Sequence, residues 1–219
     1  MYRSVTLSTG HAQSGQAMSR RSRTREAPPA EAPRRAADRI RDTAFELFYR
    51  KGIRAIGVEE IVNRAGVTKP SLYRAFESKD ELAAAYLRDY DQRFRQRFEE
   101  LAVSHPGDPR GQLLAYLEGL ASRASGVGYR GCGLTNAVIE YPDPAHPAHQ
   151  VAVDSKRALR ERLRHLSEAI GARDPAALAD GLLLLIEGSY VSGQTFGDGG
   201  PARILARAAG CLIDASREG

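Results

Sequence analysis

The chain has 219 residues, of which 42% are hydrophobic and 27% are charged, a composition typical of a folded globular protein. The longest purely aliphatic run is Leu182–Ile186, far short of the roughly 20 apolar residues that span a bilayer. The N-terminus has no apolar core of a signal peptide, so we expect no membrane span and a cytoplasmic protein. Its two cysteines, Cys132 and Cys211, are too few for a disulfide framework or a four-thiolate zinc site.

Positive charge is concentrated toward the N-terminus. The chain carries a net charge of +5, to which residues 1–33 contribute +3, residues 34–82 contribute +3 and residues 83–219 contribute −1. A basic N-terminal part on a nearly neutral remainder indicates a partner for that part, with nucleic acid as the first candidate. Residues 1–33 are predicted to be a disordered basic tail, which either attracts phosphates or has no role. Whether translation starts at Met1 or Met18 stays open.

From residue 34 onward, apolar residues recur with helical spacing and no alternating strand pattern is present. Capping residues, glycines and prolines mark the ends of the helices. The predicted helices cover approximately residues 34–51, 58–65, 69–76, 79–103, 108–124, 134–141, 149–170, 174–196 and 201–215. The predicted fold is therefore all-α, with a three-helix helix-turn-helix domain over residues 34–82 and a larger helical bundle over residues 83–219.

Residues 58–76 are two short helices joined by a tight turn at Gly66, which is the helix-turn-helix arrangement. The second helix of this motif enters the major groove of DNA, where its first residues meet base edges and phosphates. That helix and the residues after it carry donors at suitable positions. These donors are Lys69, Ser71, Tyr73, Arg74 and Lys79.

Two sequence runs in this region are distinctive, Ala44-Phe-Glu-Leu-Phe48 and the longer run Val58-Glu-Glu-Ile-Val-Asn-Arg-Ala-Gly-Val-Thr-Lys-Pro-Ser-Leu-Tyr-Arg-Ala-Phe76. Through them, residues 34–82 resemble the DNA-binding domain of TetR-family transcriptional regulators. The helical layout of residues 83–219 resembles that family's ligand-binding and dimerisation domain. The resemblance implies a homodimeric repressor of double-stranded DNA, released from a palindromic operator when a small molecule binds the C-terminal domain.

By position, the resemblance also implies which residues contact DNA. They are Thr68, Lys69, Pro70, Ser71 and Tyr73, with Lys79 at the phosphate-binding lysine of the family. Arg74 lies where the family varies, and we add it as a phosphate or base contact. One departure is the pair Ile56-Gly57, which stands where the family often has two hydroxyl residues. Gly57 can begin a helix but has no hydroxyl to offer a phosphate.

An effector pocket is expected between the helices of residues 83–196. Polar side chains on otherwise apolar helices are the candidates to face it, although each is more often a surface or core hydrogen-bonding residue. They are Tyr116, Asn136, Glu140, Tyr190 and Gln194. The mostly apolar surroundings favour a hydrophobic or aromatic small molecule.

The helix predicted over residues 174–196 is apolar on more than one face, and Gly181, Gly188 and Gly193 allow close approach. With the last helix it is predicted to form a four-helix, two-fold dimer interface. The alternative is that one chain buries all of this surface. DNA half-sites spaced by about one helical turn favour the dimer.

Three other motifs were weighed. Cys132 lies at a predicted helix N-terminus, where the helix dipole favours a thiolate, so a thiol- or electrophile-responsive regulator is the alternative function; an inert buried thiol is the simpler interpretation. The Gly126–Gly131 run matches Gly-x-Gly-x-x-Gly but follows a helix, which argues against a dinucleotide site. Asp143, His146 and His149 lie in a proline-rich loop, and no metal site is predicted.

No set of residues with catalytic spacing can be assembled from the sequence. We therefore expect no enzyme activity and no cofactor. A helical cofactor-binding protein or enzyme is kept as the alternative from a different class, because helical bundles can hold cofactors.

Overall fold

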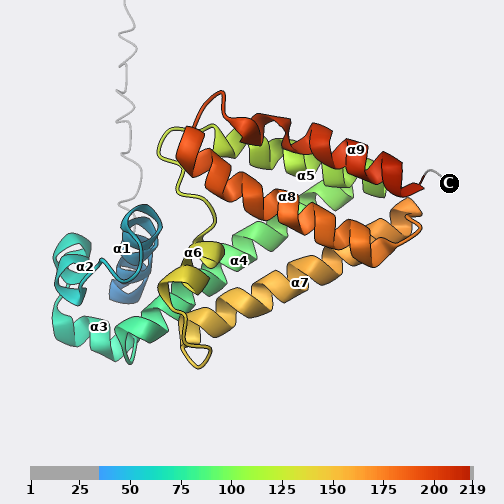
Figure 1. The fold of residues 1–219 in the computed structure, drawn as a ribbon. Helices are drawn as coiled ribbons and strands as arrows, with labels where there is room; N and C mark the ends of the chain where they lie inside the picture. Colours follow the sequence, from blue (N-terminus) through green and yellow to red (C-terminus); the bar gives the residue numbers. More distant parts are fainter. Residues whose placement is uncertain (1–34, 218–219) are drawn as a thin grey trace, which may run out of the picture. The chain divides into compact units, whose positions relative to one another are not determined.

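The structure is a computed structural model and describes residues 35–217. In this range the regular elements are helices and no strand occurs (Figure 1). The elements are α1 (Ala36–Lys51), α2 (Val58–Ala65), α3 (Lys69–Ala75), α4 (Lys79–Ser104), α5 (Pro109–Ala124), α6 (Gly133–Glu140), α7 (Pro147–Ile170), α8 (Pro175–Phe196), the 3-10 turn η1 (Pro201–Ile204) and α9 (Leu205–Arg217). The all-α prediction is confirmed. The predicted tail and the choice of start codon lie outside the described residues.

Two helix starts differ from the prediction. α7 begins at Pro147, earlier than expected, because the first turn of a helix tolerates proline and His146 caps it, its Nδ1 accepting from Ala148 N at 3.1 Å. The first turn of the last predicted helix is the 3-10 turn η1, in which Arg203 N donates to Gly200 O at 3.2 Å. Its i→i+3 bonds wind that turn more tightly than an α-helix.

α1, α2 and α3 pack into a small three-helix unit, called here the head. Its predicted core is buried at Leu47, Phe48, Ile61, Val62 and Leu72, whereas Phe76 is only partly buried. Two further core residues come from the connection between α1 and α2, where Ile53 and Ile56 are 2% and 1% exposed. This connection was predicted only as a short link, so its anchoring role is a finding of the structure.

α4 runs from the head into the bundle formed by α4–α9 (Figure 1). Ser78 caps it, its Oγ accepting from Glu81 N at 3.1 Å. The sequence Ser78-Lys-Asp-Glu81 matches a capping box, but Glu81 does not complete it, because its carboxylate accepts from Arg88 at 2.9 Å. The domain boundary predicted between residues 82 and 83 falls inside this continuous helix, and all described residues belong to one compact unit. That boundary stays a prediction.

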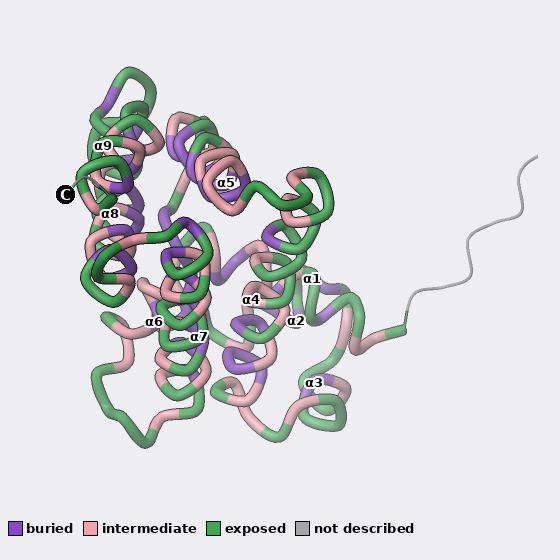
Figure 2. Tube along the Cα trace, turned by 90° about the vertical axis from the view of Figure 1, so that its right-hand side faces the viewer, coloured by how far each residue is buried: buried purple, intermediate pink, exposed green. Residues whose placement is uncertain are grey.

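The bundle is arranged around α8, which contacts α5, α7, α9 and η1. The buried positions of these helices face one another, while their exposed positions face outward (Figure 2). Gly181 and Gly193 serve this packing: a Cβ would lie 2.8 Å from Leu212 Cδ2 and 2.7 Å from Tyr129 Cε1, respectively. Among the three glycines that the sequence singled out on this helix, only Gly188 faces open space.

α8 is also long and apolar enough to cross a membrane by length and composition, with a mean hydropathy of 1.2 over its most apolar window. Its contacts with three neighbouring helices give it a different role. A core helix of a helical bundle carries the same apolar residues. We therefore interpret its apolar character as bundle packing together with an outward face that carries Leu184 and Val191, 74% and 57% exposed.

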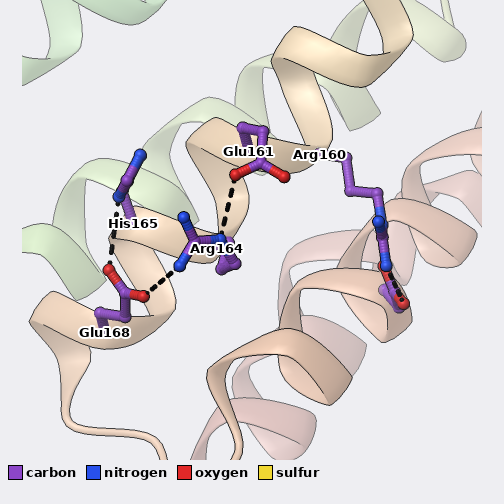
Figure 3. A network of polar contacts seen from close by, with 6 residues as sticks. Arg160, Glu161, Arg164, His165 and Glu168 are labelled. Carbon is purple, nitrogen blue, oxygen red and sulfur yellow. Dashed lines mark hydrogen bonds and ion pairs between the residues drawn. The ribbon is translucent and has the colours of Figure 1, made fainter.

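Polar contacts join α7 to α8 and cover the outer face of α7. Arg160 donates to both carboxylate oxygens of Asp180 on α8, with Nη2 2.8 Å from Oδ2 (Figure 3). Hydrogen bonding lowers the pKa of Asp180. Along α7, Arg164 bridges Glu161 and Glu168. All these side chains are exposed, where ion pairs contribute little stability, so we assign them to solubility and helix orientation.

Ser78→Ala tests the cap of α4. We expect it to lower the free energy of unfolding by about 1 kcal/mol, because the amide of Glu81 loses its acceptor. Urea denaturation at a fixed protein concentration measures the change. Ser78→Asp keeps an acceptor and serves as the control. Equal stability of Ser78→Ala and the parent would show that this cap is not needed.

Candidate DNA-binding surface and ligand cavity

α3 presents one exposed face and one anchored face. Leu72 is fully buried in the head, so residues on the opposite side of the helix point outward. Lys69, Pro70, Tyr73 and Arg74 are all exposed, with Tyr73 at 51%. The structure thus brings four of the predicted DNA-contacting residues onto one surface. It carries two cations and an aromatic ring with a hydroxyl, which suits a phosphate backbone.

Thr68 and Ser71 are engaged at the start of α3. Thr68 Oγ1 accepts from Ser71 N at 3.3 Å and lies 3.0 Å from Ser71 Oγ. This N-cap fixes the direction in which α3 leaves the turn at Gly66, whose φ of +63° is readily adopted by glycine. The DNA contacts predicted for the two hydroxyls stay predictions.

Lys69 forms an ion pair with Glu59 of α2. The hydrogen bond to Glu59 raises the pKa of Lys69, and the carboxylate charge acts in the same direction. The lysine is therefore charged at neutral pH, but a carboxylate competes for it. Lys69 has to leave Glu59, or share it, in order to reach a phosphate.

Lys79 lies at the first turn of α4 and is half-buried rather than fully exposed. Burial lowers its pKa, while the charges of Asp80 and Glu140 act in the opposite direction. At the start of α2, Gly57 makes no side-chain cap. The start of α2 therefore lacks the hydroxyl that the family often has at this position.

A cavity of about 450 Å³ lies between α1, α4, α5, α8 and the loop of residues 126–131. This volume is within the usual range of small-molecule sites. Its walls are mainly aromatic. The rings are Phe45, Tyr49, Tyr90, Phe94, Tyr116, Tyr129 and Tyr190.

α1 supplies part of this wall, so the cavity is shared between the head and the bundle. Tyr90 of α4 stacks on both rings that α1 contributes, at centroid distances of 6.3 Å to Phe45 and 6.3 Å to Tyr49. Tyr49 also fixes the loop over the cavity, because its hydroxyl accepts from Arg130 N at 3.2 Å and donates to Gly131 O at 3.5 Å. A molecule bound here would touch the head directly.

Two tyrosines of the cavity wall have buried hydroxyls. Tyr116 and Tyr190 are 2% and 3% exposed, and burial raises the pKa of each phenol well above its usual value. Both are therefore neutral O–H donors at pH 7. Their hydroxyls approach each other without hydrogen-bond geometry, and neither has a partner among the described residues; the same holds for Tyr129.

The five residues predicted to bind a ligand do not lie together. Tyr116 and Tyr190 line the cavity. Asn136 lies outside it and donates from Nδ2 to Arg130 O at 2.8 Å. Gln194 is exposed and lies against Gly131. Glu140 is at the junction with the head. A ligand-binding role for each stays a prediction.

The junction is formed by Glu140, at the end of α6, and the connection after α1. Glu140 Oε2 accepts from Arg54 N at 2.9 Å, and Arg54 Nη1 donates to Glu140 O at 3.2 Å. Gly52 is needed here, because its φ is +89° and a Cβ would lie 3.0 Å from Glu140 Oε1. This contact is a second connection between head and bundle, in addition to α4.

The histidines considered as metal ligands have structural roles at the same junction. His146 stacks on Tyr141 with ring centroids 3.9 Å apart, and its Nε2 lies 3.4 Å from Asp80 Oδ1. His149 Nδ1 lies 2.7 Å from Tyr141 O. Among residues 35–217, no group of three or more His, Cys, Asp or Glu side chains is placed to hold a metal.

Cys132 precedes α6 and is 2% exposed. Lys156 Nζ lies 3.5 Å from its Sγ and also donates to Glu187 at 2.6 Å. Thr135 donates to the other oxygen of Glu187 at 2.8 Å. Burial restricts the access of oxidants to this thiol. The geometry therefore gives no clear support to thiol sensing, which stays a prediction.

Sequence reasoning missed most of the cavity, including its charged residues. Arg93, Arg97 and Arg123 line it. A signal was present on α4, where aromatic residues recur every four positions. They are Tyr86, Tyr90, Phe94 and Phe98. Residues four apart lie on one helical face, so this stripe could have marked the wall.

A helix-turn-helix head joined to a helical bundle with a ligand-sized cavity defines a DNA-binding regulatory protein. Residues 40–86 match the family described as "Bacterial regulatory proteins, tetR family". The crystal structure of SCO4454, a TetR-family transcriptional regulator from Streptomyces coelicolor, has a TM-score of 0.77 and 30% sequence identity, covering 84% of this chain and 96% of that chain.

Two curated relatives agree with this class. The HTH-type transcriptional regulator YjdC of Escherichia coli is 28% identical over 145 residues, which are 66% of this chain and 76% of YjdC. The HTH-type transcriptional repressor KstR2 of Rhodococcus jostii is 30% identical over 129 residues, 58% of this chain and 54% of KstR2. The chain belongs to the TetR family and is a DNA-binding transcriptional regulator.

Glu59→Gln tests whether the ion pair on α2 restrains Lys69. We expect tighter DNA binding, by less than about tenfold, because an exposed pair is weak and a negative charge near the phosphates is removed. Fluorescence anisotropy at a stated salt concentration measures the affinity. Glu60→Gln is the matched control, since neighbouring Glu60 pairs with Lys51 at 2.7 Å. Equal gains for both variants would assign the effect to charge alone.

Proposed function

We propose that the protein is a homodimeric repressor that leaves a palindromic operator when a small molecule fills the cavity. The observation that carries the proposal is the shared wall, in which Phe45 and Tyr49 of the head meet α4, α5 and α8 of the bundle. A ligand there acts on the position of the head without any intermediate element. Repression is supported by the likeness to KstR2, which is named a repressor.

Release requires two states of the head. The ligand has to bind the DNA-incompetent state better than the competent one, or the equilibrium does not change. Moving it from 1:99 to 99:1 needs a preference of about 10⁴-fold. The elements available to carry this difference are α4, the loop held by Tyr49 and the Glu140–Arg54 junction.

We assign operator contacts to the exposed face of α3 and its cap, with a phosphate contact at the start of α4. The residues are Thr68, Lys69, Pro70, Ser71, Tyr73, Arg74 and Lys79. No catalytic reaction and no cofactor is part of this proposal. The regulator would act in the cytoplasm, where its operator is.

Dimerisation is proposed through α8 and α9, as a four-helix interface. α8 exposes Leu184, Gly188 and Val191 on one face, and η1 continues this apolar surface with Ile204, 41% exposed. Ala208 and Cys211 of α9 are small side chains that permit close approach. A two-fold axis would bring the same face of each chain together and set the two heads at half-site spacing.

The direct test uses palindromic duplexes from upstream of the gene and its neighbours. We expect tight, salt-sensitive binding by anisotropy, because phosphate contacts release counterions. Lys69→Ala and Tyr73→Ala should each weaken binding roughly tenfold to a hundredfold, since one contact per half-site is lost. Arg157→Ala is the control, because the side chain of Arg157 is exposed on α7. Parental affinity in both α3 variants would contradict the assigned contacts.

Leu184→Glu and Val191→Glu test the interface. A charge buried without a partner should raise the dimer dissociation constant at least roughly a hundredfold. Sedimentation equilibrium measures the molar mass over a range of concentrations. Val103→Glu is the control, because Val103 is 82% exposed on α4, away from α8 and α9. A dimer of unchanged strength in both α8 variants would exclude this face.

A further inference from the structure

The cavity is charged as well as aromatic, and the charge has one sign. Three arginines are among its lining residues, Arg93, Arg97 and Arg123, and no aspartate or glutamate is. Lining of this kind attracts anions and disfavours cations. Arginine also matches the two oxygens of a carboxylate, through parallel N–H donors.

Two of the three guanidinium groups are not committed to another role. Arg93 stacks over Phe45, with its central carbon 4.1 Å from the ring centroid. For Arg97 and Arg123, the part of the chain that the structure describes offers no ion pair, side-chain hydrogen bond or ring contact. Other arginines of the bundle, such as Arg160 and Arg162, pair with carboxylates.

Arg97 and Arg123 line the same cavity as Tyr116 and Tyr129. The charge of Arg123 opposes the effect of burial on the pKa of both Tyr116 and Tyr129, and Arg97 does the same at Tyr116. The charge of Glu187 raises the pKa of Tyr190 and Tyr129. This carboxylate accepts hydrogen bonds from Lys156 and Thr135. The cavity lining therefore carries positive charge and no carboxylate.

We propose that the cavity binds a planar aromatic carboxylate, with the carboxylate on Arg97 and Arg123 and the ring between Tyr90, Phe94 and Tyr190. As the identity of the effector, this inference rests on the proposed function; as a binding site, it stands on the cavity alone. Flat rings suit the aromatic walls, because stacked and edge contacts add to the burial of apolar surface.

Size and charge exclude other classes of ligand. A volume of about 450 Å³ accommodates one or two fused rings with a side chain, whereas a whole dinucleotide exceeds it. A cationic drug would meet three guanidinium groups. A neutral aromatic compound would fill the walls but leave the guanidinium groups without a counter-charge, so it should bind less tightly than its anionic counterpart.

The test is calorimetric titration of the full chain, without DNA, using 2-naphthoate and its neutral isostere 2-naphthamide. For ligands of this size we expect a Kd for 2-naphthoate between roughly 10 µM and 1 mM. The anion should bind at least about tenfold tighter than the amide, because only the anion gains charge-assisted hydrogen bonds. Equal affinities, tighter binding of the amide, or no heat from 2-naphthoate would overturn the proposal.

Variants assign the selectivity to residues. The double change Arg97→Gln and Arg123→Gln should reduce the preference for the anion to about one while the amide binds as before. Arg157→Gln removes an arginine of α7 and should leave the preference unchanged. A preference retained in the double variant contradicts the placement of the carboxylate.

If 2-naphthoate binds as expected but operator affinity does not change, the carboxylate site is supported and the proposed release is refuted.

Discussion

The architecture depends on α1 packing in two directions at once. One side of this helix carries Ile40, Ala44 and Leu47 into the core of the head. The adjacent side carries Phe45 and Tyr49 against Tyr90 of α4 and into the cavity. Close-packed interiors change between discrete arrangements rather than deform smoothly. Whatever fills the cavity is therefore in contact with the helix on which the recognition helix is mounted, and head and cavity cannot be considered separately.

The charged residues of α3 and those of the cavity have different surroundings. On α3, the cations are exposed, and one of them is restrained by Glu59. In the cavity wall, Arg93 and Arg97 are exposed, Arg123 is partly buried, and the lining holds no carboxylate. A charge–charge contact is stronger in such partly enclosed surroundings than at an open surface. The first arrangement suits a polyanion that covers a wide surface, and the second suits a small anion held by a few directed bonds.

Local signals in the sequence were sufficient for the helices and most of the head. Caps at Ser78, Asp108 and Asp174 and the spacing of Leu47 and Phe48 depend on near neighbours. What depends on distant neighbours was not accessible. Ile53 and Ile56 have no helical period, and their burial is decided by the packing of three helices. Asn136 and Glu140 were assigned to a pocket by their polarity, but their partners Arg130 and Arg54 place them elsewhere. Arg93 and Arg97 are exposed on α4 and resemble a solvated helix face. Only the packing of α1, α5 and the loop of residues 126–131 makes them part of a cavity wall.

The shared wall also has a consequence for engineering. Residues on α1 serve both the stability of the head and the shape of the cavity, so substitutions at Phe45 or Tyr49 alter selectivity and response together. Arg123 lies on α5, in the part of the cavity wall that the bundle supplies. A biosensor for a different class of aromatic compound would therefore be redesigned at Arg123 and its neighbours on α5, with α1 kept as the fixed part that converts occupancy into a signal.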